Sequence, residues 1–252
     1  MEIATGILLG LVSGLLSGLV GIGGGVVIIP FLVLVLGYSQ HLAQGTALLA
    51  FALPVFGWAS WNYYKHGRVD WRLALSVAAG IAIASFLVAE WVQHLRSATL
   101  TKIFAVFLIL IAAWQFWRTF RALPAVQEET MPSAKRMSIG LFVGIVAGAL
   151  KGLTGLGGGV IIVPLLNFLA KTSQHLAQGT SLLTMTLPVG VTAVIPYWQK
   201  GNVNLLVGLA LAGGILLGSA ITSRIAQKMS SKLLARVFSA TVFLMGIFLL
   251  VR

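Results

Sequence analysis

The sequence SQHLAQGT fills residues 39–46 and recurs, letter for letter, at residues 173–180. Eight consecutive identical residues do not match by chance in a chain of 252 residues, so the segment has a role that needs two copies. The same offset of 134 positions extends the match in both directions without a gap. Aligned pairs include Pro54 with Pro188, Tyr63 with Tyr197 and Gly67 with Gly201. Residues 6–118 and 140–252 are therefore two copies of one unit, joined by a polar linker.

The composition is typical of a membrane protein. Hydrophobic residues make up 58% of the chain, charged residues only 9%, and the mean hydropathy is +1.00. Soluble domains carry about a quarter charged residues, and a membrane-spanning helix needs about 20 apolar residues to cross about 30 Å of hydrocarbon. Residues 3–36 and several later runs are long, apolar and uncharged. The first run follows Glu2 instead of a basic cluster, and its copy recurs inside the chain, so we do not expect a cleaved signal peptide.

The basic residues are unevenly distributed along the chain. The formal net charge of +12 could indicate a nucleic-acid partner, but the lysines and arginines gather at residues 65–72, 118–136 and 224–236. By the positive-inside rule these segments are cytoplasmic, and no nucleic acid is expected. This placement inverts one copy relative to the other in the membrane and puts both termini outside. The predicted units are a first transmembrane repeat at 1–118, a cytoplasmic linker at 119–137 and a second transmembrane repeat at 138–252.

Both copies follow one plan, which predicts an all-α polytopic membrane protein made of two inverted-topology repeats. Each repeat has a glycine-broken helical hairpin, the octapeptide and then three transmembrane helices. The longer spans are expected at residues 43–64, 71–91 and 99–117, and at 177–198, 205–225 and 233–251. Internal repeats in a helical membrane protein point first to a transporter. Glycines at every fourth position, at 6, 10, 14 and 18 and at 140, 144, 148 and 152, favour close packing of a neighbouring helix.

A glycine triplet interrupts the first apolar run of each copy, in VGIGGGVVIIP (20–30) and TGLGGGVIIVP (154–164). Each glycine costs a helix about 1 kcal/mol relative to alanine. Backbone freed inside a membrane must be satisfied by protein or by a water-filled cavity. We therefore expect a hairpin that dips into the membrane in each copy. No strand precedes the glycines and no acid follows at the required spacing, which argues against a dinucleotide site.

The octapeptide offers several polar groups beside the next helix. Thr46 and Thr180 are expected N-caps of that helix, with the amides of Gln44 and Gln178 beside them. Helix N-termini favour anions, so one copy of the segment from each repeat would hold a shared substrate. The alternative is a pair of tight turns with capping threonines.

Two further groups are candidates for function. His41 and His175 could couple transport to protons or merely anchor a turn, and no third ligand lies nearby for a metal site. Lys151, in GALKGLTGLGGG, is a cation deep in an apolar run, and Ser17 is its counterpart. Such a lysine is a functional candidate that would bind an anion or tether the carbonyls at the glycine break. None of the five acids lies in a hairpin or an octapeptide, so a cationic substrate would find no counter-charge there.

The doubled pattern GIGGGVVIIP with AQGT and GLGGGVIIVP with AQGT resembles the sulfite exporter TauE/SafE family, also called the 4-toluene sulfonate uptake permeases. The resemblance covers the chain except for the linker. It implies a multi-pass secondary transporter of the prokaryotic plasma (inner) membrane that moves small sulfur-containing anions such as sulfite, sulfonates or sulfoacetate, without a cofactor. The predicted substrate-binding residues are Lys151, Gly23, Gly24, Gly25, Gly157, Gly158, Gly159, Gln44, Thr46, Gln178, Thr180, His41 and His175.

Two alternatives to a sulfur-anion carrier remain open. One is a carrier or channel for another small anion. The other is an intramembrane enzyme that uses His41, His175 and Lys151, although no nearby carboxylate is available to orient a histidine as a general base.

Overall fold

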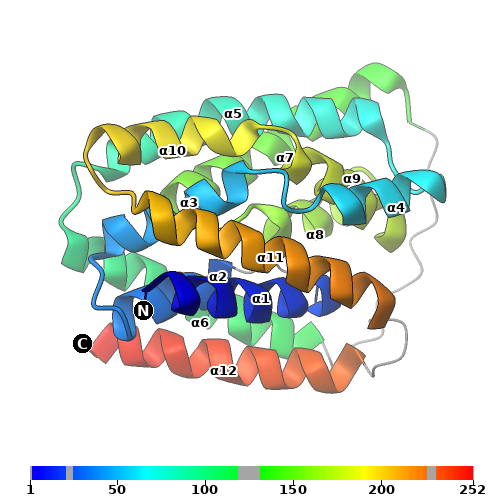
Figure 1. The fold of residues 1–252 in the computed structure, drawn as a ribbon. Coiled ribbons are helices and arrows are strands. Elements are labelled where there is room, and N and C mark those ends of the chain that lie inside the picture. Colours follow the sequence, from blue (N-terminus) through cyan, green and yellow to red (C-terminus); the bar gives the residue numbers. More distant parts are fainter. Residues whose placement is uncertain (1, 21–24, 119–130, 226–230, 252) are drawn as a thin grey trace.

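The computed structural model describes residues 2–20, 25–118, 131–225 and 231–251, and every regular element in these ranges is an α-helix (Figure 1). The first copy contains α1 Glu2–Val20, α2 Gly25–Leu34, α3 Gln40–Ala52, α4 Gly57–Lys65, α5 Trp71–Val92 and α6 Ser97–Arg118. The second contains α7 Ser133–Thr154, α8 Gly159–Leu169, α9 Gln174–Thr186, α10 Val189–Gln199, α11 Leu205–Ile225 and α12 Ser231–Val251. The predicted all-helical fold is confirmed, and the two copies have the same order of helices.

Several helices are long and apolar enough to cross a membrane. Among the described residues, α5, α6 and α7 meet that test alone, and two bent pairs, α3 with α4 and α9 with α10, raise the number to as many as five. On α5 the apolar residues Leu75, Ile83 and Leu87 are exposed. Trp71 and Trp91, at the two ends of α5, are 55% and 57% exposed. They lie about 30 Å apart along the helix, which matches two interfacial aromatic belts.

The spans predicted at residues 43–64 and 177–198 are not continuous helices, although each is long and apolar enough to cross a membrane as one bent span. Each is a pair of helices, and the bend is 42° between α3 and α4 and 46° between α9 and α10. The cause is Pro54 in one copy and Pro188 in the other, because the residue before a proline avoids the helical conformation. The residue before each proline is accordingly extended: Leu53 has φ −82° and ψ 153°, and Leu187 has φ −66° and ψ 150°.

The predicted N-caps Thr46 and Thr180 are also wrong, because both threonines lie inside helices. Ser39 caps α3 by accepting a hydrogen bond from the Leu42 N–H, and Ser173 caps α9 in the same way. Serine is among the best N-cap residues. The octapeptide therefore supplies a cap and the first two turns of a helix, and its threonine side chains are free to contact other helices.

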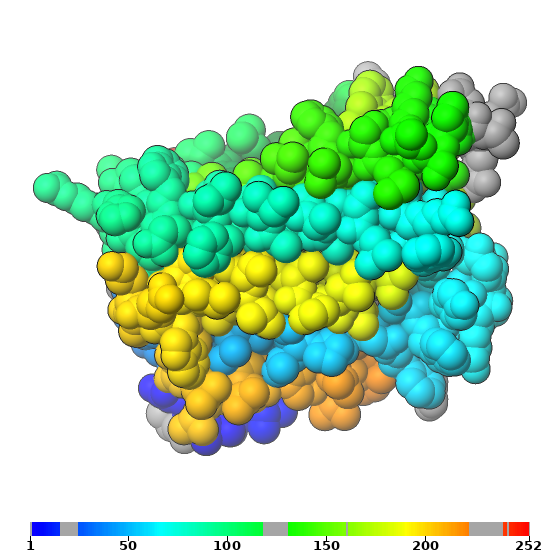
Figure 2. Space-filling view, turned by 90° about the horizontal axis from the view of Figure 1, so that it is seen from above, coloured from blue at the N-terminus to red at the C-terminus, as the bar shows by residue number. Residues whose placement is uncertain are grey.

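The predicted glycine stripes are confirmed where the structure describes them. Glycines 140, 144 and 148 of α7 pack on α5, beside Leu73, Val77 and Ile81 in that order, so these two helices run parallel. Glycines 6, 10 and 14 of α1 pack on α11 in the corresponding way. Figure 2 shows α7, α5 and α10 as adjacent bands across one face of the molecule. The first helix of each copy thus packs against the fifth helix of the other copy.

Equivalent helices of the two copies run in opposite directions through the molecule (Figure 1). The amide of Asn202, just before α11, donates to Gln93 Oε1, just after α5, at 2.9 Å. The start of α11 therefore lies at the end of α5, although the two helices are copies of each other. α7 begins at Ser133, inside the predicted linker, and most of that linker lies outside the described residues.

The glycine of each octapeptide lies directly against the other copy. A Cβ on Gly45 would overlap the Asn202 carbonyl oxygen and lie 2.9 Å from the Tyr197 Cβ. A Cβ on Gly179 would overlap the Arg68 carbonyl oxygen and lie 3.0 Å from the Tyr63 Cβ. Backbone carbonyls cannot move aside as a flexible side chain can, so both positions require glycine.

We expect Gly45→Ala and Gly179→Ala each to destabilise the protein by about 1–3 kcal/mol or more, as overpacked sites do. The control is Gly213→Ala in α11, where nothing lies within 4 Å of the added Cβ. This control should melt at or above the temperature of the parent, because alanine favours the helix. Thermal unfolding in detergent measures all three variants, and a Gly45→Ala protein as stable as Gly213→Ala would contradict the packing described.

Candidate functional site

The two octapeptide threonines join the copies of the repeat. The Asn204 backbone N–H donates to Thr46 Oγ1 at 3.0 Å, and the Asp70 backbone N–H donates to Thr180 Oγ1 at 3.1 Å. Asn204 and Asp70 occupy the same position in the two copies, just before α11 and α5. Both hydroxyls are fully buried. Each octapeptide thus satisfies a backbone donor in the loop of the opposite copy.

Gln44 connects the first copy to the end of α7. Its side chain is buried, and its Nε2 donates to the Leu153 carbonyl at 3.3 Å. The Tyr197 hydroxyl lies 2.8 Å from Gln44 Oε1 and 3.2 Å from the Gly152 carbonyl, and it donates to this pair of acceptors. The last carbonyls of a helix have no partner within the helix, so these bonds stabilise the end of α7.

Among the other octapeptide side chains, the glutamines bond an equivalent tyrosine in both copies, whereas the histidines differ. The Tyr63 hydroxyl donates to Gln178 Oε1 at 3.2 Å, as Tyr197 does to Gln44. His41 is buried and its Nε2 bonds the Val92 carbonyl at 3.2 Å, whereas His175 is exposed. The two identical segments therefore place their histidines in different surroundings.

The glycine break of the second copy separates α7 from α8. α7 ends at Thr154, and Gly155 follows with a left-handed φ of 71°. α8 begins at Gly159, and its N-cap Gly158 offers no side-chain hydrogen bond. The Gly159 N–H bonds the Gly157 carbonyl and the Ile161 N–H bonds the Gly158 carbonyl, whereas the N–H groups of Gly157 and Gly158 have no described acceptor. These two open groups lie at the partial positive charge of a helix N-terminus. Thr180 of α9 accepts the Asp70 N–H at the beginning of α5, so α8 leads the chain back along α7, and these two helices form a hairpin in this copy.

The start of α2 meets this break. A Cβ on Gly25 would lie 3.1 Å from Leu156 Cδ2 and 3.1 Å from Phe51 Cε2. A Cβ on Gly157 would lie 2.9 Å from Met185 Cε and 3.5 Å from Phe51. Helices α2 and α3 of the first copy thus converge with α9 on the α7–α8 turn.

Ser181 adds a hydroxyl to this junction. A Cβ on Gly159 would lie 3.0 Å from Met185 Sδ and 3.6 Å from Ser181 Oγ. Gly23 and Gly24, the other predicted residues of the first break, lie outside the described residues.

Lys151 lies on the side of α7 that faces the break. Ala147, one turn earlier on the same side, is 3.9 Å from where a Cβ on Gly158 would be. The Lys151 side chain is only 4% exposed, and no hydrogen bond or ion pair joins its ammonium group to another described residue. A buried charge is costly unless it is paired. Lys151 is therefore a buried cation without a described counter-charge.

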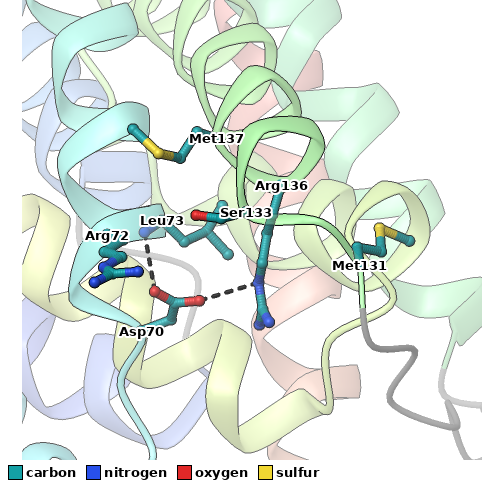
Figure 3. Close-up of a pocket in the computed structure, with 7 residues that line it drawn as sticks. All are labelled: Asp70, Arg72, Leu73, Met131, Ser133, Arg136 and Met137. Atoms are coloured by element: carbon teal, nitrogen blue, oxygen red, sulfur yellow. Dashed lines mark hydrogen bonds and ion pairs between the residues drawn. The ribbon is translucent and has the colours of Figure 1, made fainter.

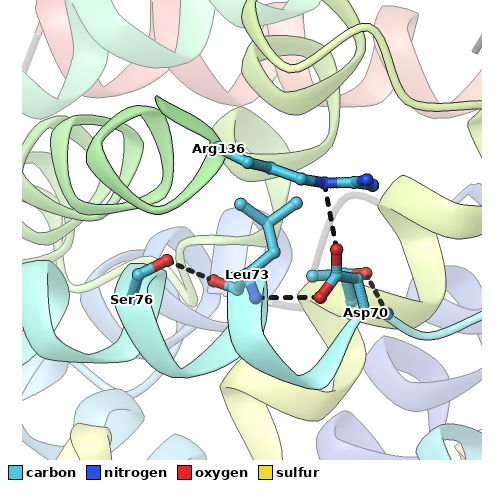
Figure 4. A network of polar contacts seen from close by, with 5 residues as sticks. Asp70, Leu73, Ser76 and Arg136 are labelled. Atoms are coloured by element: carbon cyan, nitrogen blue, oxygen red, sulfur yellow. Dashed lines mark hydrogen bonds and ion pairs between the residues drawn. The ribbon is translucent and has the colours of Figure 1, made fainter. Parts of the chain in front are cut away.

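A separate, open cavity of about 210 Å³ lies at the first turns of α5 and α7 (Figure 3). Arg136 Nε lies 3.0 Å from Asp70 Oδ2 across it, and Asp70 Oδ1 also accepts the Leu73 N–H at 3.0 Å (Figure 4). The two charged side chains are 27% and 21% exposed, and such pairs contribute about 0–1 kcal/mol. Lys151 lies about 27 Å further along α7 than Ser133, so this cavity is not part of the junction at the break.

Sequence reasoning missed the partners of the octapeptide. Tyr63 and Tyr197 match in the repeat, and so do Asp70 and Asn204 as polar residues ahead of a span. This recurrence could have predicted the contacts, because a residue that is repeated together with the octapeptide is a candidate partner of it. In the described part of the chain, no three His, Asp or Glu side chains gather as a metal site would require.

The model of one protein family, described as sulfite exporter TauE/SafE, matches residues 6–249. The chain belongs to the sulfite exporter TauE/SafE family. It is 27% identical to the "Probable membrane transporter protein YunE" of Bacillus subtilis, over 95% of this chain and 94% of that protein. A "Probable membrane transporter protein" of Xylella fastidiosa is 28% identical, over 93% of this chain and 89% of that protein. No solved structure matches the chain significantly.

Together with the apolar helices, these matches make the chain a multi-pass membrane transporter of the TauE/SafE family.

Thr46→Val and Thr180→Val should each lower the free energy of unfolding by about 0.5–1.5 kcal/mol, because each removes the acceptor of a partly buried backbone N–H. Thr186→Val is the control, since its hydroxyl bonds only the Leu182 carbonyl of its own helix. Denaturation of the three purified variants tests this expectation. If Thr46→Val unfolds like Thr186→Val, the bond to Asn204 does not hold the copies together.

Proposed function

We propose that this TauE/SafE protein is a secondary transporter that carries small sulfur-containing anions, of the sulfite or sulfonate type, across the prokaryotic plasma membrane. Membership of the family supports a transporter, and the family's description supports a sulfur oxyanion. The observation that carries the proposal is Lys151, a cation that is 4% exposed and has no partner among the described residues. It lies beside a helix break, where an anion would supply the missing charge.

We place the substrate at the junction of the broken hairpins. Lys151 would supply the charge, and the open N–H groups of Gly157 and Gly158 would donate to the substrate oxygens, as helix N-termini do for anions. The Gly159 N–H bonds the Gly157 carbonyl, so it would reach the substrate only after that bond breaks. Gly25 brings the first hairpin to the same junction, and Gly23 and Gly24 remain predicted contacts. A backbone of glycines lets an anion approach the N–H groups closely, because no side chain covers them.

The octapeptide side chains have a second role in this proposal. In the conformation described, Gln44, Thr46, Gln178 and Thr180 bond across the copies, so they contact an anion only after the copies separate. His41 bonds a backbone carbonyl and His175 is exposed, and neither is paired with a carboxylate in the described residues. We therefore propose transport without a catalytic step.

We propose that the two copies are inverted in the membrane and that opening alternates between them. The opposite directions of α5 and α11 support the inversion, as does the exchange of first helices between copies. Inverted repeats around one central site are a common basis of alternating access. Breaking the bond between Thr46 and Asn204 on one face would then open the site to that side of the membrane. Breaking the bond between Thr180 and Asp70 would open it to the other side.

Lys151→Met tests both the substrate and the site. The parent should bind sulfite or a sulfonate in preference to chloride and nitrate in titration calorimetry. The variant should remain folded and monodisperse, since methionine has a similar shape and removes a costly buried charge. It should lose about 2–5 kcal/mol of anion affinity, as expected when one partner of a buried charge pair is removed. Equal affinity in the variant would remove Lys151 from the site.

Equivalent positions should lie on opposite faces of the membrane. His66 ends α4 and Lys200 ends α10, both are exposed, and they are copies of each other. The chain has no cysteine, so His66→Cys and Lys200→Cys each create one thiol. An impermeant thiol reagent added to intact cells should label only the Lys200→Cys protein, and both after lysis. Labelling of both in intact cells would contradict the inversion.

A further inference from the structure

The buried region of this protein contains one positive charge and no described negative charge. Among the buried residues that the structure describes, Lys151 is the one lysine, arginine, aspartate or glutamate. The whole chain has only five acidic residues. Glu2 is exposed, Asp70 is paired with Arg136, and Glu90 is partly exposed without a described ion pair. The remaining two, Glu128 and Glu129, belong to the linker sequence. A bound anion therefore meets a site with one compensating charge.

The repeat makes this single charge informative. The octapeptides are identical and the glycine triplets match, yet Lys151 in the second copy corresponds to Ser17 in the first. A symmetric site would contain two lysines and would match two negative charges. The two copies share the repeated glycine and octapeptide pattern, but the position equivalent to Lys151 carries a neutral serine.

Neutral donors near the junction offer little help to a second negative charge. The Gln44 amide donates to the Leu153 carbonyl, and Thr154 Oγ1 donates to the Leu150 carbonyl. Thr46 accepts a backbone N–H from the opposite copy. The Ser181 hydroxyl and the N–H groups of Gly157 and Gly158 then remain at the break that Lys151 faces, and these carry partial charges only.

We propose that this site selects singly charged sulfur oxyanions, namely sulfonates and hydrogen sulfite, against doubly charged ones such as sulfate and sulfoacetate. This inference rests on the proposed function and names the substrate class of the same site. A monoanion neutralises Lys151. A dianion of the same size leaves one uncompensated charge in a buried, low-dielectric region, where such a charge is expensive.

The test compares anions of matched size and different charge. Binding of methanesulfonate and of sulfate to the purified parent is measured by titration calorimetry at one pH and constant ionic strength. Sulfate should bind at least about tenfold more weakly, which corresponds to roughly 1.4 kcal/mol. Ethanesulfonate and sulfoacetate form a second pair that differs by one carboxylate, and the same order is expected. In Lys151→Met, methanesulfonate binding should fall until its advantage over sulfate is lost.

The results separate the two proposals. Sulfate binding as tight as methanesulfonate binding overturns the charge selection and leaves a sulfur-anion carrier in place. An advantage of methanesulfonate that persists in Lys151→Met overturns it as well, because the preference then does not come from this lysine. Absence of binding by all four anions to a folded parent removes the proposed function itself.

Discussion

The architecture depends on a reciprocal contact in which each octapeptide lies against the loop that precedes a long helix of the other copy. Thr46 accepts the Asn204 N–H, Thr180 accepts the Asp70 N–H, and a glycine next to each threonine leaves room for the facing carbonyl. In a membrane interior, two helices gain little from hydrophobic burial, since lipid tails are as apolar as leucine. Close backbone packing and buried hydrogen bonds must therefore hold the copies together. This contact supplies both, once on each side of the molecule.

The glycine break between α7 and α8 is enclosed by helices that this contact holds in place. A broken helix frees backbone groups that lipid cannot satisfy, so it is tolerated only where surrounding protein encloses it. The end of α7 is held by Gln44 and Tyr197, and Phe51 and Met185 pack around the turn. The Gly159 and Ile161 N–H groups bond the carbonyls of Gly157 and Gly158, so the backbone donors of the turn without a described partner are the N–H groups of Gly157 and Gly158. The ammonium of Lys151, on the side of α7 that faces the break, has no described partner either.

The departures from symmetry are as informative as the repeat. His41 is buried while His175 is exposed, although both occur in the same eight residues. Lys151 and Ser17 likewise occupy equivalent positions and differ in charge. The duplication therefore sets the plan of the backbone, while side chains at equivalent positions still differ in burial and in charge.

The sequence alone determined the helical membrane class, the repeat and the glycine stripes, because these depend on local composition and on spacing along the chain. It also singled out Lys151 as an isolated cation within an apolar run. It also placed α5, α6, α11 and α12 within two residues of their observed ends. It did not reveal that Thr46 and Thr180 lie inside helices, because the serine cap and the threonine are both plausible N-caps in one short segment. Only the tertiary structure showed that Gly45 faces the Asn202 carbonyl and that Gln44 satisfies the end of α7, since residues more than 100 positions apart come together only when the copies pack.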